Sequence, residues 1–207
     1  RVKVGFIALG PMGSLMVGRL RKAGFPLATY DKNGSGNARS PRAAAQDADI
    51  LITMVPDGKA VLQAVQSALP GLKKNAIVID MSSSDPADTR RLNEILKKKH
   101  IRLLDAPVSG AKAKARDGTL AIMVGGDGAV VRRARAVLSP LGTEIFHTGG
   151  VGSGHATKAL NNYLGAAGTI AGLEALIVAE RFGLNPRTFV DVVNASTGRN
   201  STTERKI

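Results

Sequence analysis

The sequence has 207 residues, of which 43% are hydrophobic and 22% are charged, and its formal net charge is +13. This length and composition suffice for a substantial buried core and exclude a disordered or fibrous chain. Because cysteine is absent and the three histidines are scattered, disulfide frameworks and thiolate metal sites are excluded, and we expect no metal centre.

The basic residues lie in small groups along the chain rather than in one block. Aromatic residues, on which single-stranded nucleic acid would stack, make up only 3% of the sequence. We therefore favour a solvated basic surface over one that steers anionic small molecules, and nucleic-acid binding is the least favoured of the three. The groups are Arg19, Arg21 and Lys22; Lys97, Lys98 and Lys99; Lys112, Lys114 and Arg116; and Arg132, Arg133 and Arg135.

Apolar strand patterns alternate with helical patterns through the first part of the chain. Because parallel neighbours need crossover helices, this alternation predicts an α/β fold with a doubly wound parallel sheet. The predicted strands cover residues 2–9, 26–31, 49–56, 75–83, 101–108, 119–126 and 144–149, and the predicted helices cover 13–24, 42–48, 59–69, 85–100 and the region around 130–142.

The composition changes after Gly154. Residues 159–173 carry no charge, and glycine recurs among Ala, Leu and Ile. A membrane span is disfavoured because Glu174 interrupts the apolar run before the roughly 20 residues that a span requires, so we expect a buried helix. We predict an α/β domain over residues 1–153 and, over 154–207, the incomplete beginning of an all-helical domain. Its first helix should end at 182–183 and the next should start at Pro186.

The chain opens on Arg1 rather than Met, and its first apolar run is too short for a signal peptide. We therefore expect a processed or trimmed N-terminus. The expected location is the cytoplasm, or the mitochondrial matrix if the source is eukaryotic.

The stretch GFIALGPMG, residues 5–13, has the layout of a G-x-G-x-x-G turn with Ala8 in place of the first glycine. Gly10 and Gly13 retain the other two roles, which are backbone approach to a pyrophosphate and close packing of helix on strand. Ala8 is harmless if its backbone is extended and costly if it needs a positive φ. The following helix offers free N–H groups to phosphate. The expected binding residues are Leu9, Gly10, Pro11, Met12 and Gly13.

Asp31 ends the predicted second strand, where an acidic side chain would accept hydrogen bonds from the ribose hydroxyls of a dinucleotide. Together with the glycine turn it predicts a dinucleotide site. Because a carboxylate repels a 2′-phosphate, we expect NAD rather than NADP, although Lys32 beside it leaves NADP open.

Three sequence blocks together resemble the β-hydroxyacid dehydrogenase family, which includes 3-hydroxyisobutyrate dehydrogenase and tartronate semialdehyde reductase. They are GFIALGPMG, then DAPVSGAKAKARDGTLAIMVGG at residues 105–126, then GSGHATKALNN at residues 152–162. The resemblance implies a Rossmann-type domain followed by a helical one. It also implies NAD(P)-dependent hydride transfer to or from a short 2- or 3-hydroxy acid, a carboxylate-bearing substrate, and a homodimer or homotetramer.

The resemblance implies a role for each matched residue. Lys158 matches the catalytic lysine, which handles the hydroxyl or carbonyl proton, and burial would lower its pKa. Asn162, one helical turn later, would orient Lys158 or the substrate. Ser109 and Gly110 match the loop that binds the substrate carboxylate, and Ala111 departs from the glycine usually found next.

Two further matches concern the cofactor. Met54, Val55 and Pro56 correspond to the segment that lines the adenine and ribose side. Ser83 stands near the nicotinamide ribose, where the family usually has threonine.

Two alternatives stay open. One is an imine reductase of the same fold, against which Lys158 argues because that branch uses a different residue there. The other is a non-catalytic dehydrogenase-like module that binds chromatin or a protein. The net charge of +13 suggests such a module, whereas Lys158, Asn162 and the Ser109 loop argue for an enzyme.

Overall fold

The computed structural model describes residues 1–205. They fall into two compact units, of which the first is Arg1–Lys158 and the second begins at Ala159. The strands are β1 (Val4–Ile7), β2 (Leu27–Tyr30), β3 (Ile50–Thr53), β4 (Ile77–Asp80), β5 (Arg102–Asp105), β6 (Val108–Ser109), β7 (Ala121–Gly125) and β8 (Glu144–Gly149). The helices are α1 (Gly13–Lys22), α2 (Pro41–Ala45), α3 (Gly58–Ala68), α4 (Pro86–Lys97), α5 (Ala111–Asp117), α6 (Gly128–Leu138), α7 (Ser153–Phe182), α8 (Pro186–Asn194) and α9 (Ser201–Arg205), with a short 3₁₀ turn at Leu69–Gly71.

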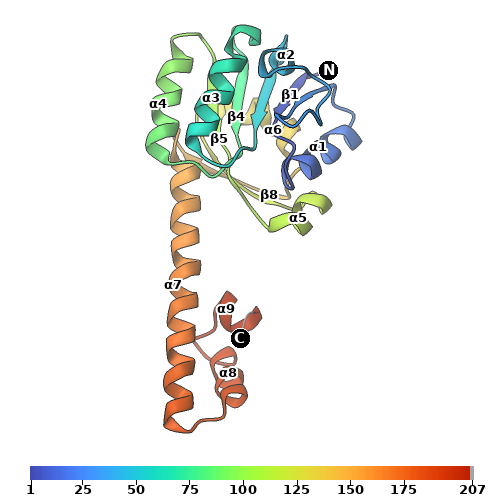
Figure 1. The fold of residues 1–207 in the computed structure, drawn as a ribbon. Coiled ribbons are helices and arrows are strands. Elements are labelled where there is room, and N and C mark those ends of the chain that lie inside the picture. The colour runs from blue at the N-terminus through green and yellow to red at the C-terminus, as the bar shows by residue number, and fades with distance from the viewer. Residues whose placement is uncertain (206–207) are drawn as a thin grey trace. The chain divides into compact units, whose positions relative to one another are not determined.

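All the strands of the first unit form one sheet, in the order β2-β1-β3-β4-β5-β7-β6, with β8 also paired to β7. Figure 1 shows this sheet with the helices of the first unit around it. The strands from β2 to β5 are parallel, as the alternating pattern predicts. Beyond β5 the sheet is mixed, because β7 runs antiparallel to β5 and β6. Parallel neighbours must be joined by a crossover helix, but α5 joins β6 to the antiparallel strand β7 beside it. The helix α5 is therefore not a crossover helix.

The core lies on both faces of this sheet. On β3, Ile50 and Ile52 pack with α1 and α6, whereas Leu51 packs with α3 and α4 on the opposite face. Every residue of β1, β3 and β4 is buried. Such strands have continuous apolar sequences because helices cover both faces of the sheet.

The order of the strands creates a switch point. From β1 the chain reaches β2 on one side and β3 on the other, so the connections after β1 and β3 leave in opposite directions. In open α/β sheets, ligands bind at the carboxyl ends of the strands beside such a point. The loops after β1, β2 and β3 are therefore where a ligand site is expected.

The second unit contains most of α7 together with α8 and α9. The predicted ends are confirmed, since α7 ends at Phe182 before Gly183 (φ 92°) and α8 starts at Pro186. The expectation of a buried helix is wrong for this chain, in which Leu160 and Leu164 are 65% and 69% exposed. The physical reason is that α8 and α9, with 9 and 5 residues, offer little apolar surface to a helix of 30.

By length and composition alone, α7 could also cross a membrane. The core helix of a soluble protein passes the same test.

Candidate active site

A cavity of about 790 Å³ lies at the switch point, among the residues that follow β1, β2 and β3 and the side of α3. This volume falls within the range of about 300 to 1,000 Å³ that is typical of small-molecule and cofactor sites. Of the residues predicted to bind the cofactor, those that line the cavity are Gly10, Pro11, Met12, Gly13, Asp31, Lys32, Met54, Val55 and Pro56.

The glycine turn shows what each of its small residues does. Ala8 has φ 79°, which is the costly left-handed conformation. A β-carbon on Gly13 would collide with the Ala8 carbonyl oxygen, so glycine is needed there for the helix to approach the strand. A β-carbon on Gly10 would meet nothing within 4 Å. The fold therefore tolerates a side chain at Gly10, and that side chain would occupy space beside the cavity.

The N-terminus of α1 opens at this cavity without a side-chain cap. Met12 at the N-cap position makes no capping hydrogen bond, and the first turn has no acidic residue. The Ser14 N–H already donates to the Gly10 carbonyl oxygen at 3.0 Å. The other first N–H groups of a helix lack partners within it and carry partial positive charge, so an anion is stabilised there. The donor set and the open space beside Gly10 fit the pyrophosphate of a dinucleotide.

Asp31 has a second role that sequence reasoning missed. Its Oδ2 accepts a hydrogen bond from the Leu9 N–H at 2.6 Å, and its Oδ1 accepts one from the Asn33 N–H at 3.0 Å. The carboxylate therefore ties the end of β2 to the turn after β1. Leu9 does not line the cavity, and its N–H is already bound to Asp31 rather than free for a phosphate.

The predicted substrate loop joins β6 to α5. Ser109 ends β6 and is half-buried, and Gly110 follows with φ 134°. Ala111 has φ 54°, so it stands in a left-handed conformation that favours glycine. The side chain of Lys114 packs against Gly110, where a β-carbon would collide with it. Alanine thus occupies two left-handed positions of the candidate site, Ala8 and Ala111.

Lys158 lies in the second turn of α7 and is half-buried. Its burial removes water from the ammonium and lowers the pKa of Lys158 below its usual range. Asn162 follows one turn later on α7 and is exposed. Ser83 is exposed in the loop after β4 and does not line the cavity.

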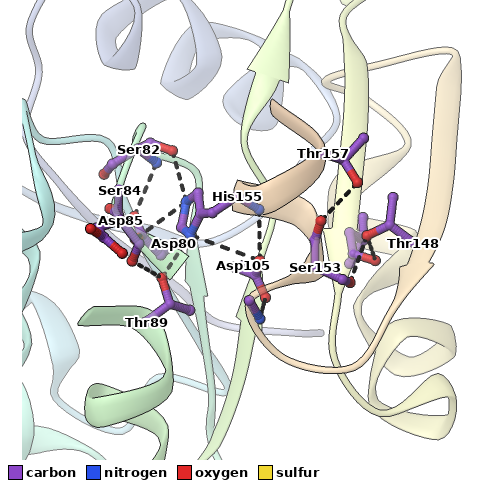
Figure 2. Close-up of polar contacts among 12 residues, drawn as sticks. Asp80, Ser82, Ser84, Asp85, Thr89, Asp105, Thr148, Ser153, His155 and Thr157 are labelled. Carbon is purple, nitrogen blue, oxygen red and sulfur yellow. Dashed lines mark hydrogen bonds and ion pairs between the residues drawn. The ribbon is translucent and has the colours of Figure 1, made fainter. Parts of the chain in front are cut away.

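Three buried residues that the sequence analysis left without a role meet where β4, β5 and α7 converge (Figure 2). Asp80 ends β4 and accepts hydrogen bonds from Thr53, Ser82 and Ser84. Asp105 ends β5 and accepts the N–H groups of Gly152 and His155 at 2.7 and 2.9 Å, which caps the start of α7. The sequence did contain a signal for these residues, because Asp80 and Asp105 each end an apolar strand pattern.

The imidazole of His155 fills the space between these two carboxylates. Its Nε2 donates to the Ser82 carbonyl oxygen at 3.0 Å, and its Nδ1 lies 2.8 Å from the Thr89 hydroxyl. The ring nitrogens lie 3.7 Å from Asp80 Oδ2 and 3.8 Å from Asp105 Oδ2. Nε2 carries a hydrogen because a carbonyl oxygen can only accept.

The fold, the switch-point cavity and the uncapped start of α1 define a Rossmann-type dinucleotide-binding protein. Residues 3–149 match the family model described as the NAD binding domain of 6-phosphogluconate dehydrogenase. Residues 152–207 match the one described as NAD-binding of NADP-dependent 3-hydroxyisobutyrate dehydrogenase. The chain belongs to the β-hydroxyacid dehydrogenase family, and its cofactor is NAD or NADP.

Its relatives include named enzymes. The chain is 36% identical to a probable 3-hydroxyisobutyrate dehydrogenase of Mycobacterium tuberculosis, over 94% of this chain and 70% of that one. It is 33% identical to 2-(hydroxymethyl)glutarate dehydrogenase of Eubacterium barkeri, over 100% of this chain and 73% of the relative. The mitochondrial 3-hydroxyisobutyrate dehydrogenase of Homo sapiens is 36% identical to this chain, over 96% of this chain and 63% of the human enzyme. These relatives support oxidoreduction of hydroxy acids.

Solved structures agree with this family. The 3-hydroxyisobutyrate dehydrogenase of Mycobacterium tuberculosis, in a structure with L-serine, has a TM-score of 0.94 and 34% identity over 99% of this chain and 74% of that one. An imine reductase of Myxococcus stipitatus with NAD⁺ has a TM-score of 0.86 at 20% identity, over 94% and 72%. At 20% identity, the similarity to the imine reductase shows only that the two proteins share a fold.

Proposed function

We propose that the protein transfers a hydride between NAD and a short 2- or 3-hydroxy acid, with Lys158 as the acid and base. The observation that carries this proposal is the half-buried Lys158 on α7, whose pKa is lowered by burial. It lies in the segment that matches the 3-hydroxyisobutyrate dehydrogenase model. An amine with a lowered pKa loses its proton more readily than an ordinary lysine, so it can accept a hydroxyl proton in one direction and donate a proton in the other.

The cavity at the switch point holds the dinucleotide. The N–H groups at the start of α1, beside Gly10, bind the pyrophosphate, and Asp31 binds the adenosine ribose. Met54, Val55 and Pro56 line the adenine and ribose side, and Ser83 lies near the nicotinamide ribose. When bound, the nicotinamide supplies the hydride acceptor or donor. The Asp31 carboxylate favours NAD, because it would repel the 2′-phosphate of NADP.

The Ser109 loop binds the substrate carboxylate. The Ser109 hydroxyl and the backbone N–H groups of Gly110 and Ala111 are donors that suit a carboxylate, and charge-assisted hydrogen bonds of this kind are short and strong. Asn162 orients the substrate or Lys158. Binding the substrate by a carboxylate fixes its hydroxyl relative to Lys158, which favours proton transfer.

The test is a panel of short hydroxy acids and semialdehydes, assayed with NAD and NADP by nicotinamide absorbance, on wild type and Lys158→Met. Methionine keeps an apolar stem and removes the amine, so kcat should fall by about 10²- to 10⁴-fold while NAD binding survives. In wild type, kcat/KM for oxidation should rise with pH as the amine loses its proton, and should level off at a lower pH than an ordinary lysine would give.

Near-wild-type turnover and an unchanged pH profile in Lys158→Met would contradict the proposal. Turnover of cyclic imines, with no turnover of hydroxy acids, would support the imine reductase instead. NAD binding without turnover of any compound would support the binding module.

We also propose that the chain assembles into a homodimer or homotetramer. The support is the apolar surface that α7 leaves exposed, including Leu160, Tyr163 and Leu164 at 65 to 69% exposure. Large exposed apolar patches commonly mark interaction surfaces. Light scattering of the purified protein tests the assembly, and a monomer would contradict it.

The location we propose is the cytoplasm, or the mitochondrial matrix in a eukaryote. The support is that the relatives include bacterial enzymes and a human enzyme named as mitochondrial. Cell fractionation with an antibody against the protein tests it, and recovery outside the cell would contradict it.

A further inference from the structure

The first turn of α7 is held by residues that are distant in the sequence. Asp105 on β5 accepts the N–H groups of Gly152 and His155. Gly154 lies so close to the carbonyl oxygens of Met123 and Asp105 that a β-carbon would collide with both. The helix that carries Lys158 therefore starts in a position set by the ends of β5 and β7.

His155 extends this attachment to β4 and α4. Its ring is fully buried, and its two nitrogens contact the Ser82 carbonyl oxygen in the loop after β4 and the Thr89 hydroxyl in the first turn of α4. Figure 2 shows the ring between these groups, with Asp80 and Asp105 on either side. One side chain thus links α7 to two other segments of the first unit.

The same contacts reach the cofactor cavity. The Ser82 hydroxyl accepts the Val55 N–H at 3.0 Å, and Val55 lines the cavity. The Ser82 carbonyl accepts from His155, which precedes Lys158 by three residues on α7. Residues three apart on a helix share a face. A continuous set of hydrogen bonds and one turn of helix therefore join the cavity wall to the proposed acid and base.

We propose that His155 is a positioning residue for Lys158. Its two ring contacts fix the first turns of α7 against the loop after β4, and so fix the amine of Lys158 relative to the cofactor segment that contains Val55. This inference rests on the proposed function for its effect on turnover. The attachment of α7 itself does not depend on that function.

The test compares His155→Leu with His155→Gln. Leucine removes both ring contacts at similar volume, whereas the glutamine amide can donate to the Ser82 carbonyl and accept from Thr89. In the leucine variant, kcat should fall about tenfold to a hundredfold, the loss expected when a reacting group moves by about 1 Å. The glutamine variant should stay within about threefold of wild type, and the Kd for NAD should change by less than about threefold in both.

Hydrogen–deuterium exchange of the amides of residues 152–158 gives a readout independent of turnover. Exchange should accelerate in His155→Leu and remain slow in His155→Gln. If wild type oxidises no hydroxy acid, the proposed function fails, and this measurement still tests whether His155 fixes the start of α7.

Val137→Ala serves as the matched control, because Val137 is fully buried on α6 away from these contacts. It should lower the melting temperature and leave kcat unchanged. If His155→Leu does not fold, Thr89→Val removes the hydroxyl contact to His155 together with the bond from that hydroxyl to the Asp85 carbonyl oxygen, and keeps the contact between His155 and Ser82. Its kcat should fall where that of Thr89→Ser, which keeps the hydroxyl, does not. Unchanged kcat and unchanged exchange in His155→Leu would overturn the inference, as would an equal loss in the leucine and glutamine variants.

Discussion

Ala8 illustrates how one methyl group at the phosphate turn is accommodated. With φ 79°, it adopts the left-handed conformation that glycine would adopt without strain. The helix nevertheless closes on the strand, because Gly13 is the residue that contacts the Ala8 carbonyl. The strain at Ala8 is present whether or not a dinucleotide is bound, so it bears on stability more than on affinity.

We therefore predict that Ala8→Gly raises the free energy of unfolding by up to about 1.6 kcal/mol. The gain is the relief of left-handed strain, about 1 to 2 kcal/mol, less about 0.4 to 1 kcal/mol for the greater freedom of glycine in the unfolded chain. Urea denaturation measures it, and the Kd for NAD should change by less than about tenfold. A variant less stable than wild type would contradict this account of Ala8.

At Gly10 the opposite behaviour is expected. Gly10→Val should fold, because a β-carbon there meets nothing within 4 Å, and it should lose NAD binding because the side chain enters pyrophosphate space. Gly18→Val is the matched control, since Gly18 on α1 also has free space around it but does not line the cavity. Calorimetric titration compares the two, and unchanged NAD binding in Gly10→Val would remove Gly10 from the site.

We propose that Asp31 influences the choice between NAD and NADP, and its hydrogen bonds to Leu9 and Asn33 hold the turn. Asp31→Asn removes the charge and keeps an oxygen that can accept the Leu9 N–H, so the Kd for NADP relative to NAD should fall by about tenfold, or 1.4 kcal/mol. Asp31→Ser should shift the preference similarly but lose stability, because the shorter side chain abandons the Leu9 and Asn33 contacts. A wild type that already prefers NADP would show that Lys32 outweighs Asp31.

At the scale of helices and strands, local patterns predicted most elements correctly. Apolar runs that alternate with helical patterns identified β1 to β5. In the structure, Asp57 and Asp85 cap the starts of α3 and α4. The pattern could not show that β7 runs antiparallel, because strand direction depends on which strand it pairs with. Nor could it show that α7 is exposed, because exposure depends on what packs against an apolar helix.

The candidate site also contains residues that the sequence predicted and residues that it did not. Motif spacing and strand ends predicted the turn at 8–13 and Asp31, and the family resemblance predicted the segment at 54–56. Residues of all three line one cavity, and their binding of the cofactor stays a prediction. The meeting of Asp105 and His155 could not be predicted from local patterns. The partners in the contacts made by Gly152 and His155 with Asp105 and Ser82 lie 47 to 73 residues apart in the sequence. Motif reasoning also gave Leu9 a phosphate role, although its N–H is bound to Asp31.

The cap of α7 can be tested as an element. Asp105→Asn should cost about 1 to 3 kcal/mol, because the amide has one acceptor oxygen and leaves one buried N–H unsatisfied. Asp127→Asn on α6 is the control, since one oxygen of Asp127 accepts both Ala129 and Val130 and asparagine retains that oxygen. Thermal unfolding of both variants measures the difference, and equal losses would contradict the capping role of Asp105.

For the whole molecule, the net charge of +13 has a kinetic consequence. If the basic surface steers anionic ligands, the association rate of NADH should fall steeply as salt shortens the Debye length from about 30 Å at 0.01 M to about 8 Å at 0.15 M. Stopped-flow fluorescence at several salt concentrations measures this rate. A rate that salt leaves unchanged would favour a surface that is merely solvated.

The cap that Asp105 supplies to α7 also orders events during folding. A helix whose N-terminus is capped by a neighbouring residue can nucleate early. For α7, the N–H groups of Gly152 and His155 are instead accepted by the carboxylate of Asp105, which lies 47 and 50 residues earlier in the sequence. The start of α7 therefore consolidates only after β5 has joined the sheet, because contacts of long sequence separation form late. We therefore expect Lys158, the proposed acid and base, to reach its position on α7 only after β5 has joined the sheet.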